Sequence, residues 1–548
     1  MVERPVLFSG SFALLFMAGW SILPGAARAQ EAGPLLTRAE RTDFRETSRY
    51  DEVVEFVSRV VEDRPDMHLT TMGYTSEGRP IPMVVVGSLA DGFPETVRAS
   101  GKTRVYLQGG IHAGEIGGKE ALLILLRELA QGRHSNWADS LVLLVAPLFN
   151  ADGNERVSLL NRPRQHGPVG GMGQRANAQD LDLNRDHLKL DAPESRSVAK
   201  MFADYDPHVA VDLHTTNGTR HGYHLTYAPP LHPATPQAVD DLLRERLLPA
   251  ITRAVKDKHG WDMYHYGNAM QGRGGMEAGW YTFDHRARFS NNYAGLRNRF
   301  GILGEAYSYA TFRERTEVSL WFVEEILHFS HAHATELARI AAEADRVSLV
   351  GLSLAVRSAF RRSAEPATIL MGETEEEVNP YSGRTMLRRT EVQVPQVMAE
   401  FVSFQAVETE RVPSVYFLPT NLADLRLRLE AHGVKTVVME DARTVEVEEF
   451  TVDSVTTATR EYQGRLEQEA FGSYRTLTRT LEAGTVAVPM DQPLARVIFT
   501  LLEPRSDDGF VAWGFLPGSL RAGEPYPVLR SSPGTSPRLS LRRPRPGS

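Results

Sequence analysis

The chain has 548 residues, too many for one ordinary hydrophobic core, so we expect two or more domains. Its net charge of −8 argues against a nucleic-acid partner, and its 42% hydrophobic and 24% charged residues are typical of a globular protein. It contains no cysteine, which excludes disulfides and cysteine-bound metals, so any metal must be held by His, Asp or Glu.

Residues 1–29 have the pattern of a signal peptide. Arg4 precedes an apolar stretch at 6–23, and the small-residue site Ala27-Arg28-Ala29 follows. Ser and Gly residues interrupt the stretch, which favours a cleaved export signal over the alternative of a retained anchor. We therefore expect a bacterial periplasmic or secreted protein with no stable membrane insertion after cleavage.

Residues 36–345 alternate between strand-like and helix-like segments, which predicts an α/β domain with a mixed sheet flanked by helices. Short apolar runs predict strands at residues 83–87, 103–109, 141–150, 208–215 and 300–308. Helical patterns lie between and after them, at residues 47–63, 118–132, 194–205, 238–260 and 315–344. In such a sheet, polar residues that follow strand ends gather at one edge.

The composition changes after residue 350, and residues 350–530 predict a smaller, β-rich domain, such as a sandwich. Strand-like runs occur at residues 390–395, 399–408, 414–419, 434–440, 450–455, 484–490, 495–504 and 510–516. One helical pattern, at residues 421–433, interrupts them. The last segment, 531–548, is rich in Pro, Ser and Arg, and we expect it to be disordered.

A candidate metal site begins in the glycine-rich segment GGIHAGEIGG at residues 109–118. His112 and Glu115 lie three residues apart after an apolar run, and His214 follows another apolar run about a hundred residues later. Two imidazoles and one carboxylate are the ligands of a catalytic zinc that keeps a fourth position for water. A His-x-x-Glu sequence also arises by chance, so the hypothesis depends on the remaining parts of a zinc hydrolase.

Further polar residues are concentrated in QRANAQDLDLNRDH at residues 174–187. Arg185 next to Asn184 is suited to binding a carboxylate, because a guanidinium can donate two parallel hydrogen bonds. Asp182 lies on the same face as Asn184 if the segment is extended, and its carboxylate could orient a ligand imidazole.

A zinc hydrolase also needs a carboxylate that takes a proton from the attacking water. Glu305, in GILGEAYSYA, is the best candidate, because it is a charged residue at the end of an otherwise apolar strand. Burial there would raise its pKa toward the useful range. The alternative is a surface glutamate at a strand edge.

These motifs in this order resemble the zinc carboxypeptidase family, over roughly residues 50–344. The order is His-x-x-Glu, then Asn-x-Asp-Gly at 150–153, Asp-Leu-Asn-Arg at 182–185, Asp-Leu-His-Thr at 212–215 and finally a glutamate on a strand. The resemblance implies one Zn²⁺ per chain, with His112, Glu115 and His214 as its ligands. It implies Glu305 as the general base and Asp182 as the residue that orients His112.

The resemblance also implies how a substrate is held. Asn184 and Arg185 would bind the free C-terminal carboxylate of a peptide. Arg175 is similar to the family's arginine that polarises the scissile carbonyl and stabilises its oxyanion. Arg162 and Arg164 compete for that role.

The chain departs from the family pattern at several positions. Ala151 stands where the family has proline, and Asp186 stands where it has a second asparagine. The phenol that the family closes over its substrate has no clear counterpart. Tyr281 and Tyr293 both precede Glu305, and Tyr293 is the favoured candidate.

We therefore expect an exported zinc metallopeptidase that hydrolyses the C-terminal bond of a peptide. One alternative is a zinc amidase or deacylase acting on N-acyl amino acids or cell-wall peptides. A second is a non-catalytic peptide-binding protein on the same scaffold.

Overall fold

The computed structural model describes residues 35–516 and 520–532. The predicted signal peptide and residues 533–548 of the predicted tail lie outside this range. The described residues from Leu36 onward belong to one compact unit. Among the described helices, none combines the length and apolar character that crossing a bilayer would need.

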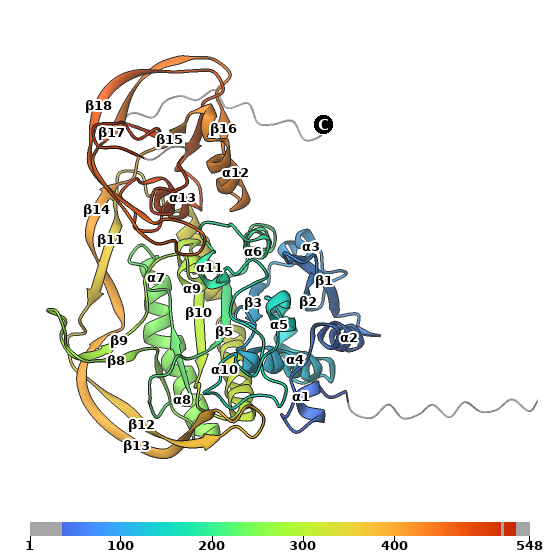
Figure 1. The fold of residues 1–548 in the computed structure, drawn as a ribbon. Coiled ribbons are helices and arrows are strands. Elements are labelled where there is room, and N and C mark those ends of the chain that lie inside the picture. Colours follow the sequence, from blue (N-terminus) through green and yellow to red (C-terminus); the bar gives the residue numbers. More distant parts are fainter. Residues whose placement is uncertain (1–34, 517–519, 533–548) are drawn as a thin grey trace, which may run out of the picture. The chain divides into compact units, whose positions relative to one another are not determined.

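A central sheet of eight strands has the order β1-β2-β4-β3-β5-β10-β6-β7. Its strands β3, β5 and β10 are labelled in Figure 1. The strands span Met67–Tyr74 (β1), Pro80–Val86 (β2), Thr103–Gly109 (β3), Leu141–Ala146 (β4), Val209–Thr215 (β5), Leu225–Ala228 (β6), Met263–His265 (β7) and Phe300–Ala306 (β10). The four central strands, β4, β3, β5 and β10, run parallel, and β1, β2 and β6 add antiparallel pairs. The mixed sheet confirms the predicted fold class.

Helices pack on this sheet and on one another. They span Arg38–Arg41 (α1), Tyr50–Val61 (α2), Pro94–Ala99 (α3), Ile116–Ala130 (α4), Ala151–Glu155 (α5), Pro193–Tyr205 (α6), Gln237–Asp241 (α7), Leu248–His259 (α8), Ser290–Leu296 (α9), Phe312–Ala332 (α10) and Ala334–Arg346 (α11). Shorter helical turns span Ser135–Asp139 (η1), Leu183–Arg185 (η2) and Leu242–Leu247 (η3). Helices α4 and α10 pack against each other and on the central strands.

The sequence explains these elements locally. Strands β3 and β4 are buried along their whole length, which is why they appear as continuous apolar runs rather than as alternating patterns. Helix α10 begins with a reciprocal hydrogen-bonded cap between Thr311 and Glu314. The helix predicted at 315–344 divides in two near His333.

The C-terminal part is mainly antiparallel β-structure. Its strands span Ser353–Arg361 (β11), Ala367–Val378 (β12), Thr385–Phe401 (β13), Ser403–Arg411 (β14), Val415–Leu418 (β15), Val437–Val438 (β16), Arg443–Thr457 (β17), Gln468–Leu481 (β18), Val486–Pro489 (β19) and Leu529–Ser531 (β20). A six-stranded sheet has the order β16-β19-β15-β20-β17-β18, and β11 pairs with β14. Its helical elements span Thr420–Leu422 (η4), Ala423–Ala431 (α12) and Ala495–Leu502 (α13).

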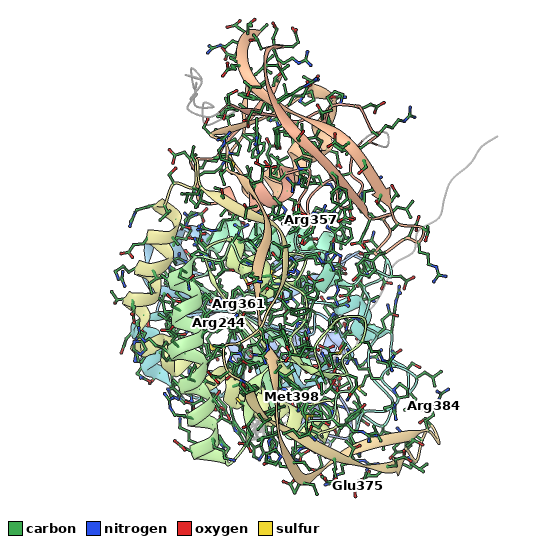
Figure 2. All side chains as sticks on the ribbon, turned by 90° about the vertical axis from the view of Figure 1, so that its left-hand side faces the viewer. Arg244, Arg357, Arg361, Glu375, Arg384 and Met398 are labelled. Atoms are coloured by element: carbon green, nitrogen blue, oxygen red, sulfur yellow. The ribbon has the colours of Figure 1, made fainter. Side chains whose placement is uncertain are left out.

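One sheet joins the two parts of the chain. Strands β8 (Asn268–Met270) and β9 (Gly279–Tyr281) come from the N-terminal part, and β9 pairs in parallel with β13. Figure 2 shows the β12–β13 hairpin, with Met398 on β13 and Glu375 and Arg384 farther along it. Helix α11 ends at Arg346 and β11 begins at Ser353, but the predicted boundary between domains 36–345 and 350–530 remains a prediction.

Two strand predictions in this part are wrong. Residues 495–504 contain helix α13, and residues 510–516 form turns. Every residue of α13 is buried, so its apolar run has no exposed polar face that would reveal a helical period. The predicted helix at 421–433 is confirmed by α12.

Candidate active site

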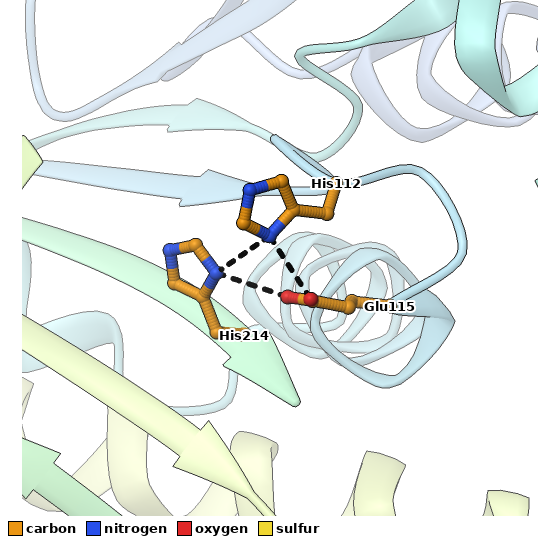
Figure 3. Close-up of side chains that lie close together, drawn as sticks. All are labelled: His112, Glu115 and His214. Atoms are coloured by element: carbon orange, nitrogen blue, oxygen red, sulfur yellow. Dashed lines mark hydrogen bonds and ion pairs between the residues drawn. The ribbon is translucent and has the colours of Figure 1, made fainter. Parts of the chain in front are cut away.

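Three side chains converge at the edge of the sheet where the parallel strands end (Figure 3). His112 follows β3, Glu115 is the residue before the first turn of α4, and His214 is near the end of β5. The Nδ1 atoms of the two histidines are 3.3 Å apart. Each lies 2.9 Å from a carboxylate oxygen of Glu115. All three side chains are buried.

Close contact between α4 and β5 makes this convergence possible. A Cβ atom at Gly118 would lie 2.6 Å from the Cβ of Leu213, so a larger residue would push the helix away from the strand. The carboxylate of Glu115 is fixed on the strand side by the backbone N–H of Thr215, at 3.0 Å. Gly118 thus has a packing role, because only a residue without a side chain lets α4 approach β5 this closely.

The outer nitrogen of each histidine faces a carboxylate. Nε2 of His112 lies 2.9 Å from Asp182, and Nε2 of His214 lies 2.8 Å from Asp212. Although burial opposes its charge, His112 holds the pKa of Asp182 far below its usual range, with Arg175 adding to the effect. Ionised carboxylates place the histidine protons on Nε2 and leave Nδ1 free to bind a metal.

The donor set fits a zinc ion. The Nδ1 atoms of two imidazoles and a carboxylate point at one another in a buried place, an arrangement that is favourable only when a proton or a metal cation lies between them. Two nitrogens and one oxygen are also the ligand set of catalytic zinc sites. Asp212 was not among the candidate residues from sequence, although it precedes His214 by two residues and so lies on the same face of β5.

Glu305 is placed beside this cluster by strand pairing. Strands β10 and β5 are parallel neighbours, and Glu305 is the residue in register with His214. Its Oε2 atom is buried and has no hydrogen-bond partner among the described residues. Burial raises the pKa of Glu305 to about 8, and the negative charge of Glu115 adds to this effect. A carboxylate with a raised pKa at the mouth of a metal site is suited to exchanging protons.

The cluster opens into a cleft of about 280 Å³. Arg175 lies at its rim with a side chain that is 47% exposed, and its Nη1 is 3.3 Å from Nδ1 of His112. Its Nε donates to Asp182 at 2.9 Å. Arg162 also lines the cleft and pairs with Glu115. Arg164 lies in an adjoining groove rather than in this cleft.

Asn184 and Arg185 line the same cleft. The side-chain carbonyl of Asn184 accepts a hydrogen bond from the backbone of Ser290 at 2.9 Å, and its amide lies 3.3 Å from Nε2 of His214. The guanidinium of Arg185 stacks on Phe289, with 4.1 Å between Cζ and the ring centre. The structure therefore places the predicted carboxylate-binding pair in the same cleft as the predicted metal ligands.

The structure does not bring Tyr293 to the site. Its side chain is fully buried, and its hydroxyl bonds with His432 and Arg297. Tyr281 is also remote, since its ring stacks on Phe401. The phenol that lines the cleft is Tyr266, in the connection between β7 and β8, and no local sequence signal indicated it. Burial raises its pKa, so it stays a hydrogen-bond donor.

Comparison with known proteins agrees with this geometry. Residues 53–217 match the profile of the zinc carboxypeptidase family. "Carboxypeptidase 2" of Trichophyton tonsurans is 27% identical over 513 residues, which cover 88% of this chain and 86% of that protein. The chain is therefore similar to the zinc carboxypeptidase family over residues 53–217 and to proteins named carboxypeptidase over most of its length.

Further proteins show the same likeness. The protein of the same description from Trichophyton rubrum is 26% identical over 509 residues, covering 88% of this chain and 86% of that one. Among solved structures, a metallo-carboxypeptidase from Burkholderia cenocepacia is 15% identical, covers 53% of this chain and 70% of its own, and has a TM-score of 0.39. Carboxypeptidase A from Helicoverpa armigera is 16% identical, with 55% and 75% covered and a TM-score of 0.39.

The match to the zinc carboxypeptidase family and the carboxypeptidase relatives support a peptide-bond hydrolase, and the match together with the His-Glu-His cluster implies zinc as its metal. These conclusions confirm the family and the enzyme class predicted from the sequence. The roles of the individual site residues, and the number of metal ions, remain predictions.

Proposed function

We propose that the protein is a carboxypeptidase that removes one residue from the free C-terminus of a peptide. The observation that carries the proposal is the layout of one cleft, in which Asn184 and Arg185 share walls with His112, Glu115 and His214. A carboxylate-binding pair close to a hydrolytic metal site restricts cleavage to the bond nearest the chain end.

The residues of the cleft have separate parts in this proposal. Zinc, when bound, supplies a Lewis acid and an activated water. Glu305 accepts the proton of the attacking water through its unpartnered oxygen and then passes it to the leaving amine. Arg175 donates hydrogen bonds to the oxyanion that develops at the scissile carbonyl. Arg162, which is committed to Glu115, is the competing candidate for this last part.

The cleft also suggests which C-terminal side chains fit. Tyr266, Phe283, Phe289 and Leu303 contribute apolar surface to its walls. The carboxylates among its described lining residues are Glu115 and Glu305, and both belong to the reaction centre. With no further acidic group to pair with a lysine or arginine, the cleft favours apolar or aromatic C-terminal residues.

A second groove supports a peptide over a small N-acyl amino acid as substrate. This groove has a volume of about 420 Å³ and shares Arg162, Thr216 and Asn217 with the catalytic cleft. Ser308 and Tyr309 also line it. A substrate with one acyl group would leave this space empty, whereas the residues that precede the scissile bond of a peptide could occupy it.

The test is mass spectrometry of a mixed peptide library incubated with the zinc-loaded protein, with and without a chelator. We expect chelator-sensitive loss of single C-terminal residues, with apolar and aromatic residues released fastest. Peptides with an amidated C-terminus are the control and should stay intact. Loss of N-acyl groups from amino acids, with peptides untouched, would support the amidase alternative instead.

We also propose that the enzyme acts outside the cytoplasm. The support is the pattern of residues 1–29, where an apolar stretch precedes a small-residue cleavage site. N-terminal sequencing of the mature protein from the culture medium or periplasm, starting at Gln30, is the expected result. An uncleaved chain in the cytoplasm would contradict it.

A further inference from the structure

A tight turn from the C-terminal part of the chain contacts the segment that carries Arg185, one of the residues that line the cleft. Strands β17 and β18 are joined by residues 458–467, and within this connection Tyr462 and Arg465 exchange backbone hydrogen bonds of 2.8 and 3.1 Å. Gln463 and Gly464, between them, have φ values of +52° and +73°. Positive φ at both central residues is the mark of a type I′ turn, whose backbone is well defined.

The turn contacts the segment that carries the predicted carboxylate-binding pair. The Tyr462 hydroxyl accepts a hydrogen bond of 3.0 Å from Nε of Arg185. The side-chain carbonyl of Gln463 accepts one of 2.7 Å from the backbone N–H of Asp182. Residues about 280 positions apart in sequence thus fix the same short stretch of chain.

Ionic and aromatic contacts hold the turn in this place. Arg465 donates two hydrogen bonds, of 2.6 and 2.8 Å, to the two carboxylate oxygens of Asp191. The ring of Tyr462 stacks on Trp513, and the buried Arg288 lies over both rings. Bidentate Arg–carboxylate pairs are directional, so the hydroxyl of Tyr462 arrives at a defined position.

Arg185 is held on several sides as a result. Tyr462 accepts from its Nε, the backbone carbonyl of Asn184 accepts from its Nη1 at 2.7 Å, and Phe289 covers one face. Its Nη2 has no hydrogen-bond acceptor among the described residues. The guanidinium is therefore fixed in orientation while one nitrogen stays available to a ligand in the cleft.

We propose that Tyr462 is a positioning residue for substrate binding, whose hydroxyl orients Arg185 toward the C-terminal carboxylate of the peptide. This inference rests on the proposed carboxypeptidase function. It makes the C-terminal β-rich part a structural component of the substrate site. A fixed orientation of Arg185 should increase the affinity for the substrate, because an arginine side chain that is already ordered loses less conformational entropy on binding.

Substituting Tyr462→Phe tests the inference, because it removes the hydroxyl and keeps the ring on Trp513. We expect the KM for a blocked dipeptide with a free C-terminus to rise about three- to tenfold, the effect of losing a hydrogen bond that orients a charged group. The kcat, the zinc content and the thermal unfolding midpoint should stay close to those of the unmodified protein.

The matched control is Tyr381→Phe. Tyr381 is exposed, and its hydroxyl accepts from Nη2 of Arg45 at 3.3 Å, so it has the same kind of bond to an arginine that does not line the cleft. This variant should leave both KM and kcat unchanged.

A double-variant cycle separates positioning from an independent contact. In an Arg185→Ala background, Tyr462→Phe should have no further effect on KM. An unchanged KM in Tyr462→Phe, or a full additional rise in the Arg185→Ala background, would overturn the inference while leaving the carboxypeptidase function intact. If the unmodified protein releases no C-terminal residue at all, the proposed function and this inference fall together.

Discussion

We call the group formed by His112, Glu115, His214 and Glu305 the metal end of the cleft. These side chains come from the central sheet and from the loops that follow its strands. We call the group formed by Asn184 and Arg185 the carboxylate end. The segment that carries this pair is held in part by a turn at residues 458–467, far away in the sequence. The metal end is held by short contacts within the N-terminal part of the chain, such as those from Asp182 and Asp212 to the two histidines. The carboxylate end depends on how the two parts of the chain pack together. Catalysis and substrate affinity are therefore open to change by different mutations.

The largest expected effect comes from breaking the metal end. His112→Ala removes one of the three predicted ligands, and we expect both bound zinc and measurable turnover to be lost. Elemental analysis after dialysis and a peptide-release assay would check this. His333→Ala, at the C-terminal end of α10, is the control and should keep both. Zinc retained at one ion per chain in His112→Ala would exclude His112 as a ligand.

Glu305→Gln should separate metal binding from proton transfer. The side chain keeps its size but loses its basicity, so we expect normal zinc content and a kcat lower by about 10²–10⁴-fold. Steady-state kinetics on the zinc-loaded variant measure this. Glu343→Gln, at an exposed position on α11, should behave like the unmodified protein. A near-normal rate for Glu305→Gln would require another base.

Two arginine variants should have different kinetic effects, one mainly on kcat and the other mainly on KM. Arg175→Ala should lower kcat by about 10²–10³-fold, because an oxyanion contact acts in the transition state. Arg185→Ala should mainly raise KM, by about 10–100-fold, because it binds a charged group of the substrate. Arg162→Ala measured alongside decides between the two oxyanion candidates: a larger loss of kcat there than in Arg175→Ala would assign the role to Arg162.

The smallest expected effect concerns the contact between the two parts of the chain. His432 accepts from the hydroxyl of Tyr293 at 2.8 Å and lies 3.0 Å from the carbonyl of Leu188. Burial, with Arg297 adding, lowers the pKa of His432 to about 3. The folded protein thus keeps His432 neutral, whereas the unfolded chain takes up a proton below about pH 6.5. Stability from this residue is present above that pH and is lost as the pH falls toward 3.

Urea unfolding between pH 7 and pH 5 would measure this loss. Each proton taken up on unfolding lowers the free energy of unfolding by about 1.4 kcal/mol per pH unit. His432→Gln should therefore have a weaker pH dependence than the unmodified protein, by up to one proton. Among the described residues, five other histidines have pKa values that burial lowers to about 3, and they contribute to the remaining slope: His208, His221, His224, His232 and His265. An identical slope in the variant would contradict the argument.

The metal end was predictable from the sequence because each of its motifs can be recognised within a short stretch of sequence. Strand ends, glycines and the spacing of His112 and Glu115 are visible in a short window, and the parallel strand order then brings His214 and Glu305 side by side. The same logic could have indicated Asp212, which shares a face with His214. Helix α13 was mistaken for a strand because burial on all sides removes the periodic signal.

The carboxylate end was predictable only in part. Asn184 and Arg185 were visible as a motif, but their support was not, since Tyr462 and Gln463 come from a different sheet. Tyr293 was favoured for its position before Glu305, yet its hydroxyl is used in the contact with His432. Tyr266 reaches the cleft from the connection between β7 and β8. Which phenol lines the cleft is decided by tertiary packing and not by any local sequence pattern.

The pairing of β9 with β13 limits how the enzyme could be shortened. A truncated chain that ends after α11 would keep the predicted metal ligands and Glu305, and could therefore be taken for a minimal catalytic domain. It would also leave one edge of β9 without its neighbour, at residues 279–281, and an unpaired strand edge is a template for aggregation. Engineers who want a smaller peptidase should therefore redesign that edge before trimming the chain.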